Sequence, residues 1–362
     1  MEWPQVRPLS PDTGIRCMIM RGGTSKGAFF VESDLPSRDE ERDQLLLKIM
    51  GTPDRRQIDG MGGAHPLTSK VAIASSTDDA DTDVEYLFLQ LGVDQPIVTD
   101  RQNCGNLLAA VGPFALERGL IYVPNGDASV RIRMRNTGGV AVARFKVRDG
   151  APVYEGRTAI SGVPGTAGEI SIDFLDIAGG TTGSLLPSGN TVDEIDGVAV
   201  TLIDNGMPVV VLRADDLGVG GYEDCQELES NSDLRARLET IRLEAGPLMN
   251  LGDVSGATVP KMTLVAPPLR GGTVSTRTFI PYRCHDAIGV LGAVSVATAC
   301  LLPGTPANHM ADLVTSNGLI TLEHPTGAFD VRVELDGQDV VRAGIIRTAR
   351  KLMDGYVYPR SY

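Results

Sequence analysis

The chain has 362 residues, 42% of them hydrophobic, and a formal net charge of −13. This length exceeds one ordinary core and predicts two domains. The charge disfavours non-specific binding to nucleic acid or to an anionic membrane, although a local cationic site could still bind a small anion. Without a signal-peptide pattern or an apolar run of the ~18 residues that a membrane span needs, we expect a cytoplasmic globular protein.

The cysteines and histidines argue against disulfides and metal sites. The five cysteines are odd in number, scattered and free of any CxxC pair, so we expect free thiols in a reducing compartment. The four histidines have no metal-ligand spacing. We therefore expect no metal site.

A glycine-rich turn joins the first two expected strands, 15–20 and 28–31. Its sequence, Arg21-Gly-Gly-Thr-Ser-Lys-Gly27, suits a tight hairpin with exposed backbone N–H groups. It lacks the spacing of a nucleotide P-loop and leads into a strand instead of a helix. We expect an anion-binding hairpin tip or, alternatively, a solvated turn. The candidate ligands are two charged and two hydroxyl side chains, Arg21, Lys26, Thr24 and Ser25.

Lys70 stands where a second glycine-rich loop, 59–69, becomes the strand 71–73. The stem of a lysine at such a junction is expected to be partly buried. Desolvation favours the neutral amine, which makes Lys70 a candidate general base. The alternative is a lysine whose stem covers apolar surface while its amine reaches water.

Cys104 lies in a polar turn that opens directly into an apolar run, 107–115. This pattern predicts a buried helix with the thiol at its N-terminus. The unpaired N–H groups and the dipole of such a helix favour a thiolate and can hold a substrate carboxylate.

Three other segments are predicted to be helical. A capping box at 37–40 opens a helix that stops at Gly51. The segment 232–245 is expected to be an exposed amphipathic helix with one apolar face. In the tail, we expect a strand from 340 and a short helix over 343–353.

The remaining pattern predicts many short strands and an internal repeat. Hairpin turns punctuate 122–174, and the linker-like loop 181–190 suggests domains 1–185 and 186–362, with the extreme C-terminus packing back on the first. A second apolar helix of small residues, 290–300, follows Gly289 about half the chain after Gly105. We therefore expect one unit used twice, with strands around a central helix.

Several ordered motifs resemble those of the methylaconitate isomerase family: Met20–Gly27, Asp59–Lys70, Gln102–Asn106 and Asp204–Pro208. The stretches Gln102–Arg118 and His285–Ala299 look most similar to the 4-oxalomesaconate tautomerase branch, whose members act in the breakdown of gallate, protocatechuate and lignin-derived aromatics. The resemblance implies an α+β, diaminopimelate epimerase-like fold. In that fold two pseudo-symmetric domains, each a β-barrel-like sheet around a central helix, have the active site in the cleft between them.

The resemblance also implies roles for individual residues. Lys70 matches the family's general base and Cys104 its partner acid/base, whereas the second epimerase cysteine has no counterpart in His285–Gly289. The expected reaction is a cofactor-independent proton transfer, either a 1,3-allylic isomerisation or a keto-enol tautomerisation of an unsaturated tricarboxylate. Further candidate substrate ligands are Ser69, Asn103, Gly105, Asn106, Lys261, Arg277 and His285.

Three alternatives stay open at this point. They are a 2-methylaconitate cis-trans isomerase of propionate metabolism, an amino-acid epimerase, and a non-catalytic tricarboxylate-binding accessory protein. The missing second cysteine disfavours the epimerase. Beyond the small-molecule substrate we expect neither nucleic acid nor membrane as a partner, and a homodimer is left open.

Overall fold

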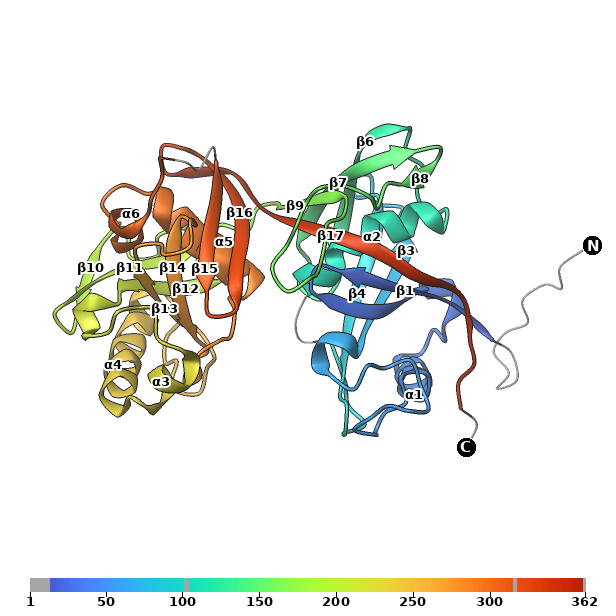
Figure 1. The fold of residues 1–362 in the computed structure, drawn as a ribbon, viewed down its shortest axis with the longest axis horizontal. Helices are drawn as coiled ribbons and strands as arrows, with labels where there is room; N and C mark the ends of the chain where they lie inside the picture. Colours follow the sequence, from blue (N-terminus) through green and yellow to red (C-terminus); the bar gives the residue numbers. More distant parts are fainter. Residues whose placement is uncertain (1–13, 101–103, 315–317, 361–362) are drawn as a thin grey trace, which may run out of the picture. The chain divides into compact units, whose positions relative to one another are not determined.

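The structure is a computed structural model that describes residues 14–100, 104–314 and 318–360. Its contacts divide the chain into two compact units (Figure 1). Unit 1 comprises Met1–Ile172 and Arg347–Tyr362, and unit 2 comprises Asp173–Ile346.

The division falls earlier in the chain than the sequence-based boundary at 185/186, because residues just after Ile172 bind within unit 2. Asp173 forms an ion pair with Arg342 at 2.8 Å. The backbone N–H groups of Thr181 and Thr182 donate to the carboxylate of Asp204 at 2.9 and 3.0 Å.

Unit 1 is built on a closed ring of strands. Its strands are β1 (Ile15–Gly22), β2 (Ser25–Val31), β3 (Lys70–Ser76), β4 (Val84–Leu91), β5 (Val98–Thr99), β6 (Gly126–Met134), β7 (Val140–Arg148) and β8 (Ala151–Pro152). The chain leaves through β9 (Glu169–Phe174) and returns through β17 (Asp339–Val357). Pairing runs β1–β2–β3–β4–β6–β7–β9–β17 and back to β1, which closes a barrel.

Helix α2 (Gly105–Glu117) lies inside this barrel and contacts β1, β2, β3, β4, β6, β7 and β8 (Figure 1). Helix α1 (Asp39–Met50) covers the other face. Successive β2 residues show the two faces: Phe29 stacks on Phe114 of α2 with ring centroids 5.5 Å apart, whereas Phe30 packs with the α1 cluster. Because both faces are covered, β2 and β3 each contain an unbroken apolar run, at 28–31 and 71–74.

Unit 2 also places strands around an apolar helix. Its strands are β10 (Asp193–Ile195), β11 (Val198–Asp204), β12 (Pro208–Arg213), β13 (Lys261–Ala266), β14 (Val274–Phe279), β15 (Leu319–His324) and β16 (Gly327–Asp336). Its helices are α3 (Cys225–Ser230), α4 (Ser232–Leu248), α5 (Val290–Leu301) and α6 (Pro306–Met310). The apolar α5 contacts β11, β12, β15 and β16, and α4 packs on the opposite face.

The order of elements and pairings is the same in both units. The antiparallel hairpin β1–β2 corresponds to β11–β12, the parallel pair β2–β3 to β12–β13, and the antiparallel pair β3–β4 to β13–β14. The central helix follows, and then a parallel pair, β4–β6 or β14–β15. Lys70 and Lys261, the first residues of β3 and β13, therefore hold equivalent positions.

Most predicted elements are confirmed, and two predictions are wrong. The helices 232–245 and 290–300 appear as α4 and α5. The capping box at 37–40 is absent: the N-cap of α1 is Arg38, which makes no side-chain capping bond. The helix over 343–353 is instead part of β17, because these residues pair with β16 and then with β1.

No helix in the described part of the chain is long and apolar enough to cross a membrane.

Candidate active site

The start of α2 carries the candidate thiol. Cys104 is the N-cap residue of α2 and is 8% exposed. Its side chain makes no capping hydrogen bond, and the first helical turn contains no acidic residue. The helix start therefore offers the N–H groups of Gly105 and Asn106 and the positive end of the dipole to an anion. The predicted position of Cys104 at a helix N-terminus is confirmed.

Glycines let the β1–β2 hairpin approach this helix start. A Cβ atom on Gly22 would lie 2.5 Å from the backbone oxygen of Asn106. Gly23 has φ +52°, and a Cβ there would lie 2.2 Å from Oδ1 of Asn106. The glycines of this motif thus bring the hairpin tip onto the first turn of α2.

Strand alternation decides which hairpin side chains face α2. Gly22 pairs with Ser25, and both point to the inner face, defined as the barrel face toward α2. Arg21 pairs with Lys26, and both point to the outer face. Of the predicted hairpin ligands, only Ser25 is directed at α2, while Thr24 is exposed at the tip.

Ser25 has an unusual environment for a hydroxyl. It is 1% exposed, and its Oγ has no hydrogen-bond partner among the described residues. A buried hydroxyl left unpaired costs about 1–3 kcal/mol. The unpaired hydroxyl of Ser25 would be free to donate a hydrogen bond to a ligand.

Arg21 is engaged on the outer face. Its Nη1 donates to the oxygens of Gly23 and Thr348 at 2.8 and 3.0 Å, and burial together with the charge of Arg350 lowers its pKa. The adjoining cavity of about 80 Å³ is smaller than the ~300 Å³ of ordinary small-molecule sites. Arg21 therefore fastens the hairpin to β17.

Lys70 is on the inner face and is 7% exposed. It pairs with Gly27, where an added Cβ would lie 2.8 Å from both the Lys70 oxygen and Cδ2 of Leu107 in α2. Its Nζ lies 4.9 Å from the centroid of the Phe88 ring and donates to Oε1 of Gln90 at 2.7 Å. The expected burial of Lys70 is thus confirmed, and the residue lies on the barrel face toward α2.

Gln90 fixes the direction of this amine. Its Nε2 donates to the carbonyl oxygens of Pro66, Ser69 and Leu91, so its own oxygen must face Lys70. The partner of Lys70 is a neutral amide, and no carboxylate pairs with its amine among the described residues.

Ser69, the residue before Lys70, is fully buried. Its Oγ donates to Oε1 of Gln57 at 2.7 Å, and the same oxygen accepts the N–H of Ala64. Nε2 of Gln57 in turn donates to Thr52. The hydroxyl proton of Ser69 is thus used within the loop that precedes β3.

Two inner-face residues escaped sequence reasoning. Arg347 of β17 is 4% exposed, and its Nε donates to Oδ1 of Asn106 at 3.1 Å, which places a buried positive charge at the start of α2. Tyr86 of β4 is fully buried; burial and the nearby charge of Cys104 raise its pKa well above the usual value. Neither residue lies near a glycine-rich motif, so local sequence carried no signal.

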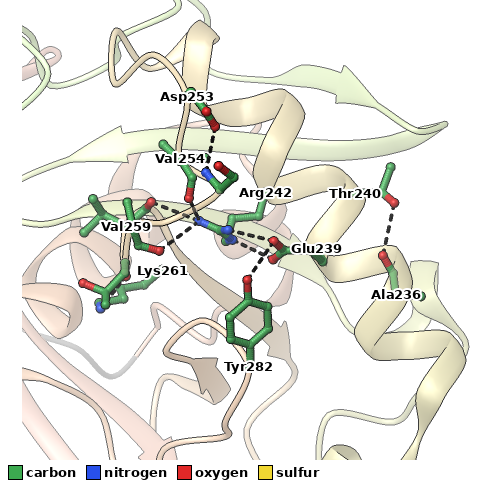
Figure 2. A network of polar contacts seen from close by, with 12 residues as sticks. Ala236, Glu239, Thr240, Arg242, Asp253, Val254, Val259, Lys261 and Tyr282 are labelled. Atoms are coloured by element: carbon green, nitrogen blue, oxygen red, sulfur yellow. Dashed lines mark hydrogen bonds and ion pairs between the residues drawn. The ribbon is translucent and has the colours of Figure 1, made fainter.

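In unit 2, Lys261 stands at the edge of a polar network centred on Arg242 (Figure 2). The fully buried Arg242 donates to the carbonyl oxygens of Val254 and Val259 and pairs with Glu239 at 2.7 Å. Nζ of Lys261 donates to the oxygen of Thr258. Burial and the charge of Arg242 lower the pKa of Lys261.

His285 precedes α5 and interacts electrostatically with Lys261. Burial lowers its pKa, Asp286 opposes this change and Lys261 adds to it. Its Nδ1 accepts the N–H of Ala287 at 2.9 Å, which leaves Nε2 as the donor of the neutral ring. By contrast Arg277, 4% exposed, donates to the carbonyls of Tyr222, Glu223 and Thr276 and holds backbone.

The predicted residues thus fall into distinct sets. Ser25, Lys70, Cys104, Gly105 and Asn106 gather around the first turn of α2, and Lys261 and His285 gather in unit 2. Arg21, Lys26, Ser69 and Arg277 are directed elsewhere. Asn103 lies outside the described residues.

A buried amine and a helix-capping thiol, together with donors for an anion, are the groups that proton transfer on a carboxylate-bearing substrate requires. The mixed α/β fold, rich in strands and with a closed barrel, is shared with a hydroxyproline epimerase from Agrobacterium vitis, with a TM-score of 0.53 at 13% identity over 94% of this chain and 92% of that one. This likeness shows the fold alone.

The pattern of the PrpF protein family matches residues 13–360, and the chain belongs to this family. It is 57% identical to a (4E)-oxalomesaconate Delta-isomerase of Novosphingobium sp. (strain KA1), over 94% of this chain and 96% of the relative. It is 55% identical to a 4-oxalomesaconate tautomerase of Pseudomonas putida, over 95% and 96%. A crystal structure of a methylitaconate-delta-isomerase superposes with a TM-score of 0.88 at 33% identity, covering 96% of both chains. The family resemblance is confirmed.

Proposed function

We propose that this chain is an isomerase of 4-oxalomesaconate that moves a proton between two atoms of the conjugated tricarboxylate. The identities of 57% and 55% to relatives with this substrate in their names support the substrate. The observation that supports the chemistry is Lys70, a buried amine with a neutral hydrogen-bond acceptor, on the barrel face toward the helix that Cys104 caps.

In the proposed mechanism, neutral Lys70 removes a C–H proton conjugated with a carbonyl and gives a dienolate. One N–H bond points at Gln90, which leaves the lone pair to meet the substrate. The proton then returns at another carbon for an allylic shift or at oxygen for tautomerisation. Cys104 is the partner acid that delivers or shares this proton. Each acid–base group contributes roughly 10²–10⁴-fold.

The developing negative charge needs donors that are in place beforehand. The N–H groups of Gly105 and Asn106, the hydroxyl of Ser25 and the guanidinium of Arg347 are the inner-face groups proposed for this role. Such preorganised donors commonly contribute about 3–4 kcal/mol each to transition-state stabilisation. The charge of Arg347 also suits one substrate carboxylate.

Lys261 and His285 are proposed as carboxylate ligands in unit 2. Lys261 is the counterpart of Lys70 in the repeated order of strands, and it lies close enough to His285 to lower the pKa of that ring. The cleft position of the site, the pseudo-symmetric epimerase-like arrangement, the homodimer and the cytoplasmic location remain predictions.

The deciding assay is spectrophotometric turnover of purified chain with 4-oxalomesaconate, 2-methylaconitate and 3-methylitaconate. We expect kcat/KM for 4-oxalomesaconate to exceed the other two by at least about 10²-fold, since each tenfold step is about 1.4 kcal/mol of transition-state binding. The alternatives predict different results: faster turnover of methylaconitate for the isomerase of propionate metabolism, or tight binding without proton exchange for an accessory protein.

A further inference from the structure

Two cysteines of unit 2 lie in direct contact, although they are 59 positions apart in the sequence. Sγ of Cys225, the first residue of α3, lies 3.0 Å from Sγ of Cys284, in the loop before α5. A disulfide needs about 2.05 Å between the sulfurs. The sulfurs must therefore approach each other by a further ~1 Å for the bond to form.

Independent contacts already hold the two backbone segments together. The N–H of Cys284 donates to the Glu229 carboxylate of α3 at 2.9 Å. The guanidinium of Arg277 donates hydrogen bonds to the carbonyl oxygens of Tyr222 and Glu223, just before α3, at 2.7 Å each. Cys284 also pairs with Phe279 at the end of β14. The two thiols are therefore kept opposite each other by the fold itself.

We propose that Cys225 and Cys284 are a modification site, a thiol pair that closes to a reversible disulfide when a peroxide reaches unit 2. The bond would tie α3 to the loop that carries His285. This inference does not depend on the proposed isomerase activity.

The chemistry balances with hydrogen peroxide as the oxidant. The half-buried Cys225 is the more accessible sulfur, and as thiolate it attacks the peroxide, giving a sulfenic acid and water after protonation. The Cys284 sulfur displaces the sulfenic oxygen, its thiol proton leaves with a second water, and the S–S bond forms. Two electrons pass from the thiols to the peroxide. Burial raises the pKa of both thiols, so closure is slow at neutral pH.

The test uses the full chain, treated with hydrogen peroxide, alkylated and digested for mass spectrometry. We expect a Cys225–Cys284 cross-linked peptide, a mass loss of about 2 Da that dithiothreitol reverses, and an apparent melting temperature higher by roughly 5 °C or more, because the bond closes a long loop. Cys225→Ser is the matched variant, and it should show neither the cross-link nor the shift.

The proposal is overturned if peroxide leaves both thiols free to alkylate, or converts them to separate sulfinic acids, while the chain stays folded. It is also overturned if Cys225→Ser shows the same stabilisation, because the shift would then come from another cysteine. Activity with any substrate plays no part in these readouts, so failure here leaves the proposed function untouched.

Discussion

The hydroxyl of Ser25 is expected to affect stability and activity in opposite directions. It is buried without a partner among the described residues, so Ser25→Ala should leave the free energy of unfolding unchanged or raise it by about 1 kcal/mol. The same change removes a proposed donor to the dienolate and should lower kcat roughly 10–10³-fold. Urea unfolding and steady-state kinetics on one preparation measure both effects. A variant that loses stability and keeps its turnover would show that Ser25 only packs.

Gln90 tests whether the Lys70 amine acts as a base. In Gln90→Glu, a carboxylate would replace the neutral acceptor 2.7 Å from Nζ and hold the amine as ammonium. We expect kcat at neutral pH to fall at least about tenfold and to recover as the pH rises. Gln90→Met, which removes the acceptor without adding charge, should lower kcat without this recovery. Parallel pH–rate profiles for the two variants would contradict the assignment.

Arg347 is expected to act mainly on substrate binding. Arg347→Lys keeps the charge but loses the planar fork, so we expect KM to rise roughly tenfold with a smaller change in kcat. Arg347→Gln should raise KM further. If kcat alone falls while KM is unchanged, the residue positions Asn106 and does not bind a carboxylate.

Single residues also show how far sequence reasoning reaches. Cys104 was placed correctly because a polar turn followed by an apolar run defines a helix start locally. Which of Ser25 and Lys26 faces α2 could not be inferred, since this depends on the strand register of the hairpin. Arg347 was missed because it reaches α2 from the far end of the chain.

At the level of elements, the β1–β2 hairpin depends on glycine where it meets α2. In Gly23→Ala, the new Cβ would lie 2.2 Å from Oδ1 of Asn106 at a φ of +52°. Gly119→Ala is the matched control, because it has φ +69° and nothing within 4 Å of its Cβ. We expect Gly23→Ala to cost about 1–3 kcal/mol of stability and to reduce turnover, whereas Gly119→Ala keeps full turnover. Equal loss of activity in both would contradict the role given to the close approach.

Strand β17 is fastened to α2 by an ion pair at the other end of the helix. Nη1 and Nη2 of Arg118 donate to the two carboxylate oxygens of Asp354, and this contact lowers the pKa of the carboxyl. Because the pKa of Asp354 is lowered in the folded state, the ion pair contributes its full stability at pH values above the unfolded pKa of about 3.9. This contribution is lost as the pH falls through the lower pKa of the folded state.

Asp354→Asn should therefore reduce the free energy of unfolding at neutral pH. The reduction should be no more than about 1–2 kcal/mol, because solvent screens a side chain that is 37% exposed. The difference from the unaltered chain should be constant above about pH 5 and shrink below about pH 4. Urea unfolding at several pH values measures it, and a difference that persists at acid pH would exclude the ion pair as its source.

The wrong helix prediction belongs to the same strand. The stretch 343–353 mixes strand formers such as Ile345 and Thr348 with good helix formers such as Ala349 and Leu352, so local propensity is divided. The stretch forms a strand because its residues pair first with β16 and then with β1. Those partners lie far from it in the sequence, beyond what local patterns report.

For the whole molecule, the internal repeat could be predicted from the sequence, but the equivalence of individual residues in its two copies could not. Two apolar helices that each follow a glycine indicated one unit used twice, and the matching strand orders of the two units agree with this. The equivalence of Lys70 and Lys261 appears only once both β3 and β13 are known to begin at a lysine.

The claim that Lys70 is the base is tested most directly by solvent deuterium exchange with Lys70→Met. We expect the unaltered chain in D2O to incorporate deuterium into 4-oxalomesaconate or its product. Lys70→Met should lose exchange and turnover together by at least about 10²-fold, with Lys146→Met, which changes an exposed side chain of β7, as the control. Folded Lys70→Met that still exchanges and turns over substrate near the normal rate would contradict the account.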